Sequence, residues 1–189
     1  QAFSRLCPRT RVKVFETTLS GTDEALLTGQ VQIAITAKVL PGFIGNPLAL
    51  VNMIPVVAPS HRLAKLSAKQ AISEDQLKQE RQIVIRDSGT KREQDAGWLG
   101  AEQRWTFSHF ATSANAVTAG LGFAFLPEHS VASQLANHSL VQLNLEAGGI
   151  RKLPLYLVQT APDYAGPAVT AACTALSAAF KVQSSKKPA

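Results

Sequence analysis

Small polar residues stand at three places where predicted strands end, and two of these places lead directly into predicted helices. Thr17 and Thr18 precede one helix, and Ser108 and His109 precede another. The first turn of a helix has backbone N–H groups without partners in the helix and carries a partial positive charge, so such positions suit small anions. Thr36 ends a further predicted strand, and we expect an exposed hydroxyl there. The pattern therefore predicts a binding site for a small anion.

A second set of candidates surrounds the predicted strand at residues 82–86. Arg86 ends this strand, where its guanidinium would either form a surface ion pair or fork onto a ligand carboxylate. Ser88 follows in the turn and is either a turn residue or a ligand contact. Phe125, in a later apolar segment, is either a core residue or a pocket wall. For Ser108 the alternatives are helix capping alone, or capping together with ligand contact.

The residue patterns of catalysis and metal binding are missing from the sequence. Ser88 has Asp87 beside it but lacks the GxSxG elbow, and nothing places a histidine next to it; a hydrolase using this serine stays an alternative. The four histidines show neither HxxxH spacing nor carboxylate pairing, so we predict no metal site. The GLG sequence at residues 120–122 lacks the P-loop lysine and the dinucleotide fingerprint. We predict no cofactor and no enzymatic activity.

The composition is that of a globular protein that stays in the cytoplasm. The chain has 189 residues, of which 46% are hydrophobic, and this is enough for a core. Its longest apolar run is far shorter than the roughly 20 residues needed to cross a bilayer, and no signal segment stands at its start. We therefore expect a cytoplasmic protein without a membrane partner. Cys7 and Cys173 lie far apart and outside any CxxC pattern, which predicts two buried thiols in a reducing cytoplasm; a disulfide or a zinc site is the alternative.

The net charge of +6 comes from 19 Lys and Arg against 13 Asp and Glu. Such a charge can indicate nucleic-acid binding. The basic residues, however, cluster only near the N-terminus and in the C-terminal tail, and the others are scattered among acidic residues. Because no predicted helix carries a basic stripe, we expect no sequence-specific DNA binding by this chain itself.

Residues 108–127 are predicted to form one folded unit of helix, tight turn and strand. Ser108 is predicted to be the N-cap, and apolar residues follow at helical spacing. Gly120 and Gly122 are expected to supply a positive φ angle and a close approach of two backbones where the helix ends. The apolar run at residues 123–126 is predicted to be a doubly buried strand of a parallel sheet.

The remaining periodic segments alternate between strands and helices, which predicts an α/β protein. Residues 11–16 alternate valine with basic residues, a pattern typical of a half-buried strand, and a capping-box-like start at Ser20 predicts the next helix. The long apolar runs at residues 50–58 and 153–159 are predicted to cross between two sub-domains. The sub-domains are predicted to consist of residues 1–58 with 160–189, and of residues 59–159.

Five segments in order resemble the effector-binding domain of LysR-type transcriptional regulators. They are LLTGQVQIAIT (26–36), VVAPSHRLAK (56–65), QIVIRDSG (82–89), RWTFSHFATSANAVTAGLGFAFLP (104–127) and YLVQTAPDYAGPAV (156–169). The resemblance implies a periplasmic-binding-protein-like fold of type 2, in which two α/β sub-domains are joined by two crossover strands and a small effector binds in the cleft. It also implies that the first strand and the first cleft loop would precede Gln1.

The resemblance implies a regulatory domain that senses an effector, which we expect to be a small organic anion. The residues expected to contact it are Thr17, Thr18, Thr36, Arg86, Ser88, Ser108, His109 and Phe125. DNA would be bound only by a winged helix-turn-helix domain missing from this sequence. The resemblance further implies a homodimer or homotetramer, in which residues 23–28 and 31–35 of one chain pair with residues 108–127 of another. A solute-binding protein of the same fold is the alternative.

Overall fold

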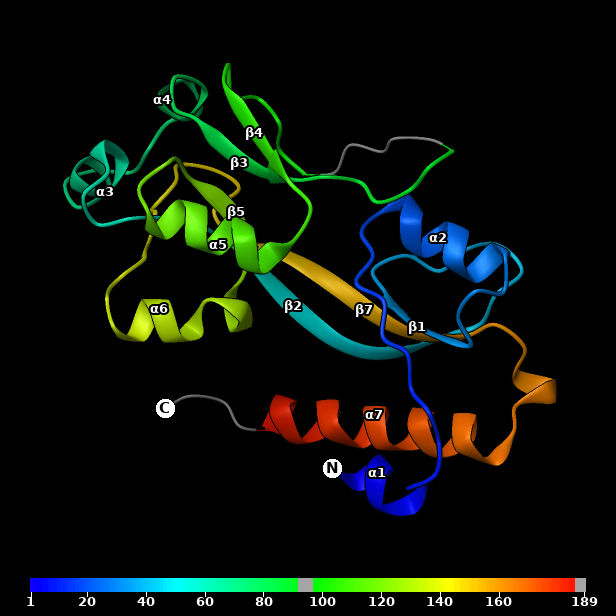
Figure 1. Ribbon diagram of the computed structural model, residues 1–189. Helices are drawn as coiled ribbons and strands as arrows, with labels where there is room; N and C mark the ends of the chain where they lie inside the picture. Colours follow the sequence, from blue (N-terminus) through cyan, green and yellow to red (C-terminus); the bar gives the residue numbers. More distant parts are fainter. Residues whose placement is uncertain (92–96, 186–189) are drawn as a thin grey trace. The chain divides into compact units, whose positions relative to one another are not determined.

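A computed structural model describes residues 1–91 and 97–185 of the chain (Figure 1). The chain divides into two compact units. Unit 1 comprises Gln1–Leu50, Gly89–Lys91 and Pro154–Ala189, and unit 2 comprises Val51–Ser88 and Arg92–Leu153. The sub-domain boundaries that we expect from the sequence stay a prediction.

Unit 1 is built on an antiparallel strand pair with a helix packed against it. Its elements are α1 (Ala2–Leu6), α2 (Ser20–Leu27), β1 (Ile33–Thr36), the 3-10 helix η2 (Pro162–Tyr164) and α7 (Pro167–Ser185). β1 pairs antiparallel with the end of β7 (Arg151–Gln159). α2 covers this pair through Leu26, which forms a buried cluster with Ala34 and Val158.

The long helix α7 lies beside α1 within unit 1 (Figure 1). Its Cys173 is buried, and the Gln159 side-chain amide donates a hydrogen bond to the Cys173 sulfur at 2.7 Å. Cys7 and Cys173 are both free thiols, but only Cys173 is buried as predicted, since Cys7 is partly exposed. Across the described parts of the chain, no helix combines the length and the apolar character that a membrane span requires.

Unit 2 contains a parallel strand pair and strands that add to β2 (Gly45–Val57). Its elements are α3 (Arg62–Ser67), α4 (Glu74–Lys78), β3 (Gln82–Ile85), β4 (Arg104–Phe107), α5 (Phe110–Thr118), β5 (Ala124–Pro127), the 3-10 helix η1 (Glu128–Ser130), α6 (Ala132–Ala136) and β6 (Val141–Gln142). β3 and β4 run parallel, while β5 and β6 each pair antiparallel with β2. α5 buries Ala114 and Val117 in a cluster with Ile83 and Leu126.

Two strands carry the chain from one unit to the other, as the sequence predicts. β2 passes the division between Leu50 and Val51, and β7 passes it between Leu153 and Pro154. These two strands are neighbours in a sheet whose strand order is β1, β7, β2, β5. The predicted α/β architecture with two crossover strands is thus confirmed.

The strand predicted at residues 123–126 exists as β5, but its sheet is not the predicted parallel one. β5 pairs antiparallel with β2, from Met53 opposite Pro127 to Val56 opposite Ala124. Its parallel contact is limited to an isolated bridge between Phe123 and Gln82. An apolar run shows that both faces of a strand are covered, and it does not determine in which direction the neighbouring strand runs.

The predicted glycine turn before β5 is confirmed at both positions. Gly120 has a φ angle of 80°, in the left-handed region that favours glycine. A Cβ atom on Gly122 would lie 2.3 Å from the backbone oxygen of Arg81. This contact brings the chain before β5 against the start of β3, where the Phe123 N–H donates to the same oxygen at 3.0 Å.

The strand predicted at residues 11–16 is wrong, since this segment has no regular secondary structure. Its apolar side chains are exposed, and Val14 reaches 88% exposure. An alternating pattern forms a strand only when another strand supplies hydrogen bonds. Within the described residues no strand pairs with this segment.

Candidate functional site

The parallel strands β3 and β4 bring two groups of candidate residues to one edge of unit 2 (Figure 1). The Arg86 backbone N–H donates to the Phe107 carbonyl at 2.8 Å. Arg86 and Ser88 follow β3, while Ser108 and His109 follow β4. Ligands of open α/β sheets commonly bind outside the carboxyl ends of parallel strands. This edge is therefore the candidate site of unit 2.

Arg86 supplies a cation at this edge. Its side chain is exposed, and its Nε donates to the backbone carbonyl of Asp87 at 3.1 Å. Asp87 is buried, whereas Ser88 is exposed. The Nε bond holds the guanidinium at this edge, and a guanidinium has five N–H donors in a fixed fork that matches a carboxylate. Both alternatives for Arg86, ion pair and carboxylate fork, stay predictions.

The cap predicted for the helix of the unit at residues 108–127 is wrong, because Ser108 is not the N-cap. α5 begins at Phe110, and its N-cap is His109 in an extended conformation, with no side-chain hydrogen bond to the first turn. β4 continues to Phe107, so Ser108 still belongs to the turn that leaves the strand. The first turn of α5 is consequently open to an external acceptor rather than closed by a serine side chain.

Phe125 is only partly buried, so both alternatives, core residue and pocket wall, stay predictions. It packs against a buried cluster of unit 2 and meets Phe123 edge-on at 6.4 Å between ring centroids. Its ring is also covered by the guanidinium of Arg151, at 4.5 Å from the ring centroid. The sequence offers no signal for this cation–π pair, because the two residues belong to different strands and are far apart in the chain.

In unit 1 the candidate threonines surround the start of α2. The hydroxyls of Thr17 and Thr22 are 2.8 Å apart and hydrogen-bonded, and Thr18 is buried. The capping box predicted at Ser20 is wrong, since Ser20 is already the first helical residue and Leu19 is the N-cap without a side-chain bond. Leu19 has a φ angle of 50°. A positive φ at a non-glycine residue costs free energy, so the surrounding contacts must hold this turn in place.

A segment distant in sequence packs against α2. The Glu24 carboxylate of α2 accepts the backbone N–H groups of Thr90, at 2.9 and 3.0 Å, and of Lys91, at 2.7 Å. Gly89 packs closely against the start of α2, since a Cβ atom on it would lie 1.9 Å from the Ser20 hydroxyl oxygen and 3.1 Å from the Gly21 backbone nitrogen. Sequence reasoning missed this arrangement, because nothing in either segment signals a partner so far along the chain.

These hydrogen bonds also keep Glu24 ionised to lower pH. The Lys91 N–H contributes most, followed by the Thr90 N–H, and together they hold the pKa of the Glu24 carboxyl below its ordinary value of 4.5. Hydrogen bonds donated to a carboxylate favour its ionised form. Near neutral pH, Glu24 is therefore an anion that binds the segment at residues 89–91.

Thr36 does not offer the exposed hydroxyl that we expect from its position at a strand end. The residue is only 8% exposed, and its hydroxyl donates to the Lys38 carbonyl at 3.1 Å while accepting the Lys38 N–H at 3.3 Å. Threonine side chains commonly close such local turns onto their own backbone. Any contact of Thr36 with a ligand would compete with this turn.

The histidines have no metal-binding arrangement in the described residues. Outside residues 92–96 and 186–189, no three His, Cys, Asp or Glu side chains gather as a metal ion would require. His61 instead caps α3, its Nδ1 accepting the Leu63 N–H at 3.2 Å. Burial lowers the pKa of His61 below its ordinary value of 6.5, against the opposing attraction of Glu80. His61 is thus a neutral structural residue.

Comparison with known proteins places this architecture among regulatory domains. The profile of a family described as LysR substrate binding domain matches residues 1–181. The chain is similar to the CcmR regulatory domain of Synechocystis PCC6803 in complex with 2-PG, with a TM-score of 0.70 and 16% identity over 95% of this chain and 88% of that one. The common fold confirms the predicted periplasmic-binding-protein-like fold of type 2.

Two further structures share this fold. The effector binding domain of QuiR in complex with shikimate gives a TM-score of 0.66 and 17% identity, over 95% of this chain and 87% of that one. The full-length virulence activator AphB of Vibrio cholerae, from the LTTR family, gives a TM-score of 0.67 and 16% identity. The match covers 95% of this chain and 61% of AphB. No curated protein matches the chain by sequence.

Proposed function

This chain belongs to the family of LysR substrate-binding domains, and we propose that it senses a small organic anion for a bacterial LysR-type transcriptional regulator in the cytoplasm. The proposed function is binding without catalysis. Effector binding shifts the population of conformations, and the differential affinity for these conformations is passed to a DNA-binding domain. That DNA-binding domain would make the sequence-specific contacts with DNA.

The arrangement at the ends of β3 and β4 carries the proposal. Arg86 provides a guanidinium at this edge, and α5 begins beside it without a side-chain cap. A guanidinium fork and the N–H groups of a helix start are two kinds of donor that suit a carboxylate. Ser88, Ser108 and His109 are exposed beside them and complete the donor set that we propose.

The ligands of the similar domains support a small effector. QuiR is described in complex with shikimate, which is a carboxylate, and CcmR in complex with 2-PG. In unit 1 we also propose contacts from Thr17, Thr18 and Thr36, and in unit 2 from Phe125. The threonines are tested by replacement with valine, which keeps the side-chain shape and removes the hydroxyl.

Thermal denaturation with a ligand panel tests the proposal. The purified chain is screened with small mono- and dicarboxylates and with small amines, since a ligand that binds only the folded state raises the melting temperature. We expect carboxylates, and not amines, to stabilise the wild type. Arg86→Gln removes the charge and should weaken the binding of the stabilising carboxylate about 10- to 100-fold, as hydrogen bonds to charged groups contribute about 1.5–3 kcal/mol.

The matched control is Arg104→Gln, which removes an exposed cation from the opposite end of β4. It lowers the net charge by the same amount and should leave carboxylate binding unchanged. Stabilisation by amines alone, or equal binding losses in both variants, would contradict the assignment of Arg86 to the effector site.

We further propose a two-fold dimer in which α2 and β1 of one chain pair with residues 108–127 of another. Exposed apolar side chains on both partners support this pairing. Leu27 and Ile35 are exposed in α2 and β1, and Leu121 is exposed after α5. Light scattering tests the dimer: Leu27→Asp should produce a monomer, whereas Leu50→Asp, at an exposed leucine outside both surfaces, should not. A wild-type monomer at high concentration would contradict the proposal.

A further inference from the structure

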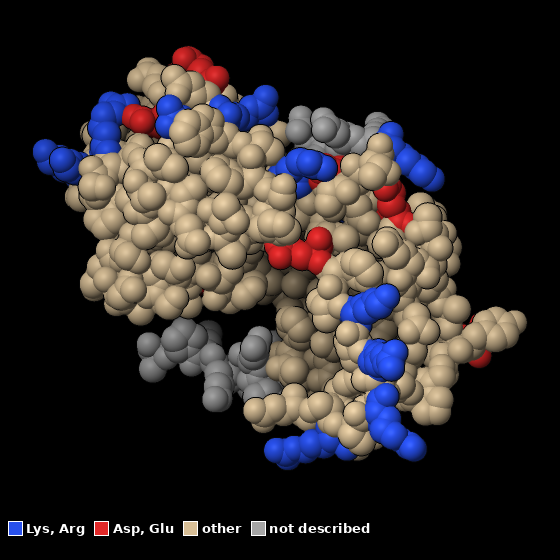
Figure 2. Space-filling model, in the orientation of Figure 1, with Lys and Arg blue, Asp and Glu red and all other residues tan. Residues whose placement is uncertain are grey.

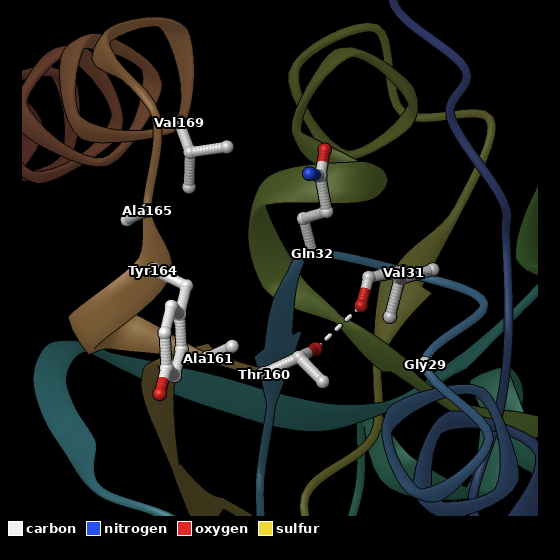
Figure 3. A pocket seen from close by; sticks show the side chains of 8 residues that line it. All are labelled: Gly29, Val31, Gln32, Thr160, Ala161, Tyr164, Ala165 and Val169. Atoms are coloured by element: carbon white, nitrogen blue, oxygen red, sulfur yellow. Dashed lines mark hydrogen bonds between the residues drawn. The ribbon is translucent and has the colours of Figure 1, made fainter.

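Unit 1 contains a cavity of about 200 Å³ that is lined by none of the candidate effector residues (Figure 3). Its wall is formed by the turn that follows α2, the end of β7, η2 and the first turn of α7. The lining residues are Gly29, Val31, Gln32, Thr160, Ala161, Tyr164, Ala165 and Val169. All of them belong to unit 1.

The size of the cavity fits one ring. An apolar cavity of about 150 Å³ in another protein is large enough to bind benzene. No lining residue carries a charge. A charged ligand would have to lose water without gaining an opposite charge, which is costly. The cavity therefore favours a neutral molecule of about that size.

Thr160 joins two segments of the cavity wall. The Thr160 hydroxyl donates to the Val31 carbonyl, and the Thr160 N–H donates to the Gln32 carbonyl at 3.1 Å. The Thr160 side chain is thus engaged in joining the end of β7 to the segment before β1. Its hydroxyl therefore stabilises the cavity wall, and a polar group of a ligand would be bound by other lining residues.

The side chain of Gln32 provides that recognition. Within the described chain its carboxamide makes no hydrogen bond, and Figure 3 shows Val169 pointing toward it. A carboxamide offers both a donor and an acceptor. Tyr164 adds an aromatic ring that is 91% exposed, although it lies in an ordered 3-10 turn. An exposed aromatic ring beside a cavity provides a stacking surface for a ligand ring.

We propose that this cavity is a second small-molecule site, which takes a neutral single-ring compound bearing an amide or a similar donor–acceptor group. The apolar side chains and Tyr164 would enclose the ring, and Gln32 would pair with the polar group. The site differs from the proposed effector site in position and in ligand charge.

Benzamide is the probe, and benzoate and toluene are its charged and apolar counterparts of nearly the same shape. The amide resonances of the isotope-labelled chain are followed by NMR during titration. We expect saturable shifts at Gly29, Thr160, Ala161 and the Gln32 side chain with benzamide. Benzoate should bind at least about tenfold more weakly, because no cation faces it.

Two variants separate ligand contact from structural effects. Val169→Phe fills the cavity and should abolish the shifts, whereas Thr174→Phe adds the same ring elsewhere on α7 and should not. Gln32→Met keeps the side-chain length and removes the carboxamide. It should weaken the binding of benzamide about three- to tenfold and leave the binding of toluene unchanged. Gln32 is exposed, so this variant remains informative if Val169→Phe fails to fold.

Three results would overturn the proposal: no benzamide shifts at these residues, equal binding of benzoate, or unchanged benzamide binding in both Val169→Phe and Gln32→Met. The carboxylate that stabilises the wild type should keep its full thermal shift in Gln32→Met. Failure of this second site is thereby distinguished from failure of the effector site.

Discussion

The carboxylate of Glu24 accepts hydrogen bonds from the backbone N–H and the hydroxyl of Thr90, a residue 66 positions further along the chain. The N–H lies 2.9 Å from one carboxylate oxygen and 3.0 Å from the other, and the hydroxyl lies 2.9 Å from the latter. Through this contact, residues 89–91 of a loop that leaves β3 belong to unit 1. A distant segment is thus bound to α2 through the Glu24 carboxylate.

Removing the Glu24 carboxylate should release this segment. In Glu24→Ala we expect faster trypsin cleavage after Lys91, because the Lys91 N–H loses its acceptor and local opening becomes easier. Limited proteolysis with mass spectrometry of the fragments measures the rate. The matched control is Glu102→Ala at an exposed acid of unit 2. Equal cleavage rates in both variants would show that the carboxylate does not restrain the segment.

The same contact predicts an acid-dependent loss of stability. The pKa of Glu24 is lowered in the folded state, so its contribution is fully present above 4.5 and is lost as the pH falls through the folded-state pKa. We expect the stability difference between wild type and Glu24→Gln to shrink from about pH 6 to about pH 3. Urea denaturation along this series measures it, and a constant difference would contradict the assigned shift.

His61 should produce a separate pH effect at higher pH. Its folded-state pKa is lowered by burial, so its contribution is present above 6.5 and is lost as the pH falls through the folded value. His61→Asn keeps a capping acceptor without titrating, and its urea midpoint should fall less than that of the wild type between about pH 7.5 and pH 5.5. His129→Asn, at an exposed histidine, should retain the wild-type dependence.

Gly122→Ala should destabilise unit 2. The added Cβ would lie 2.3 Å from the Arg81 backbone oxygen, and the start of β3 would have to move. Overpacking of this kind costs about 1–3 kcal/mol of unfolding free energy. Gly166→Ala, where no atom lies within 4 Å of the added Cβ, should change stability by less than about 0.5 kcal/mol. Urea denaturation compares the two, and similar losses would refute the close contact.

The chain itself should bind duplex DNA only weakly and in a salt-sensitive way. Figure 2 shows basic side chains in a row over the extended segment between α1 and α2. Arg9, Arg11 and Lys13 of this segment are exposed, and phosphate contacts of such residues weaken as salt increases. Replacing these three residues by Gln should remove most of the residual binding in a gel-shift assay. Sequence-specific binding at physiological salt would contradict the prediction.

The sequence by itself determined the features that depend on local chemistry. Apolar residues at helical spacing located α5, and Gly120 and Gly122 located the turn before β5, because positive φ and close backbone approach are properties of single residues. The long apolar runs located the two crossing strands. The order of five segments along the chain was enough to indicate the family.

Only the tertiary structure decided how these elements combine. It made β5 antiparallel to β2, left residues 11–16 without a strand partner, and placed the N-cap of α5 at His109 instead of Ser108. It also brought Thr90 and Lys91 onto Glu24 and Arg151 onto Phe125. These contacts join residues that are far apart in the chain. A sequence pattern indicates which side chains will be buried, but it does not specify which distant group each of them contacts.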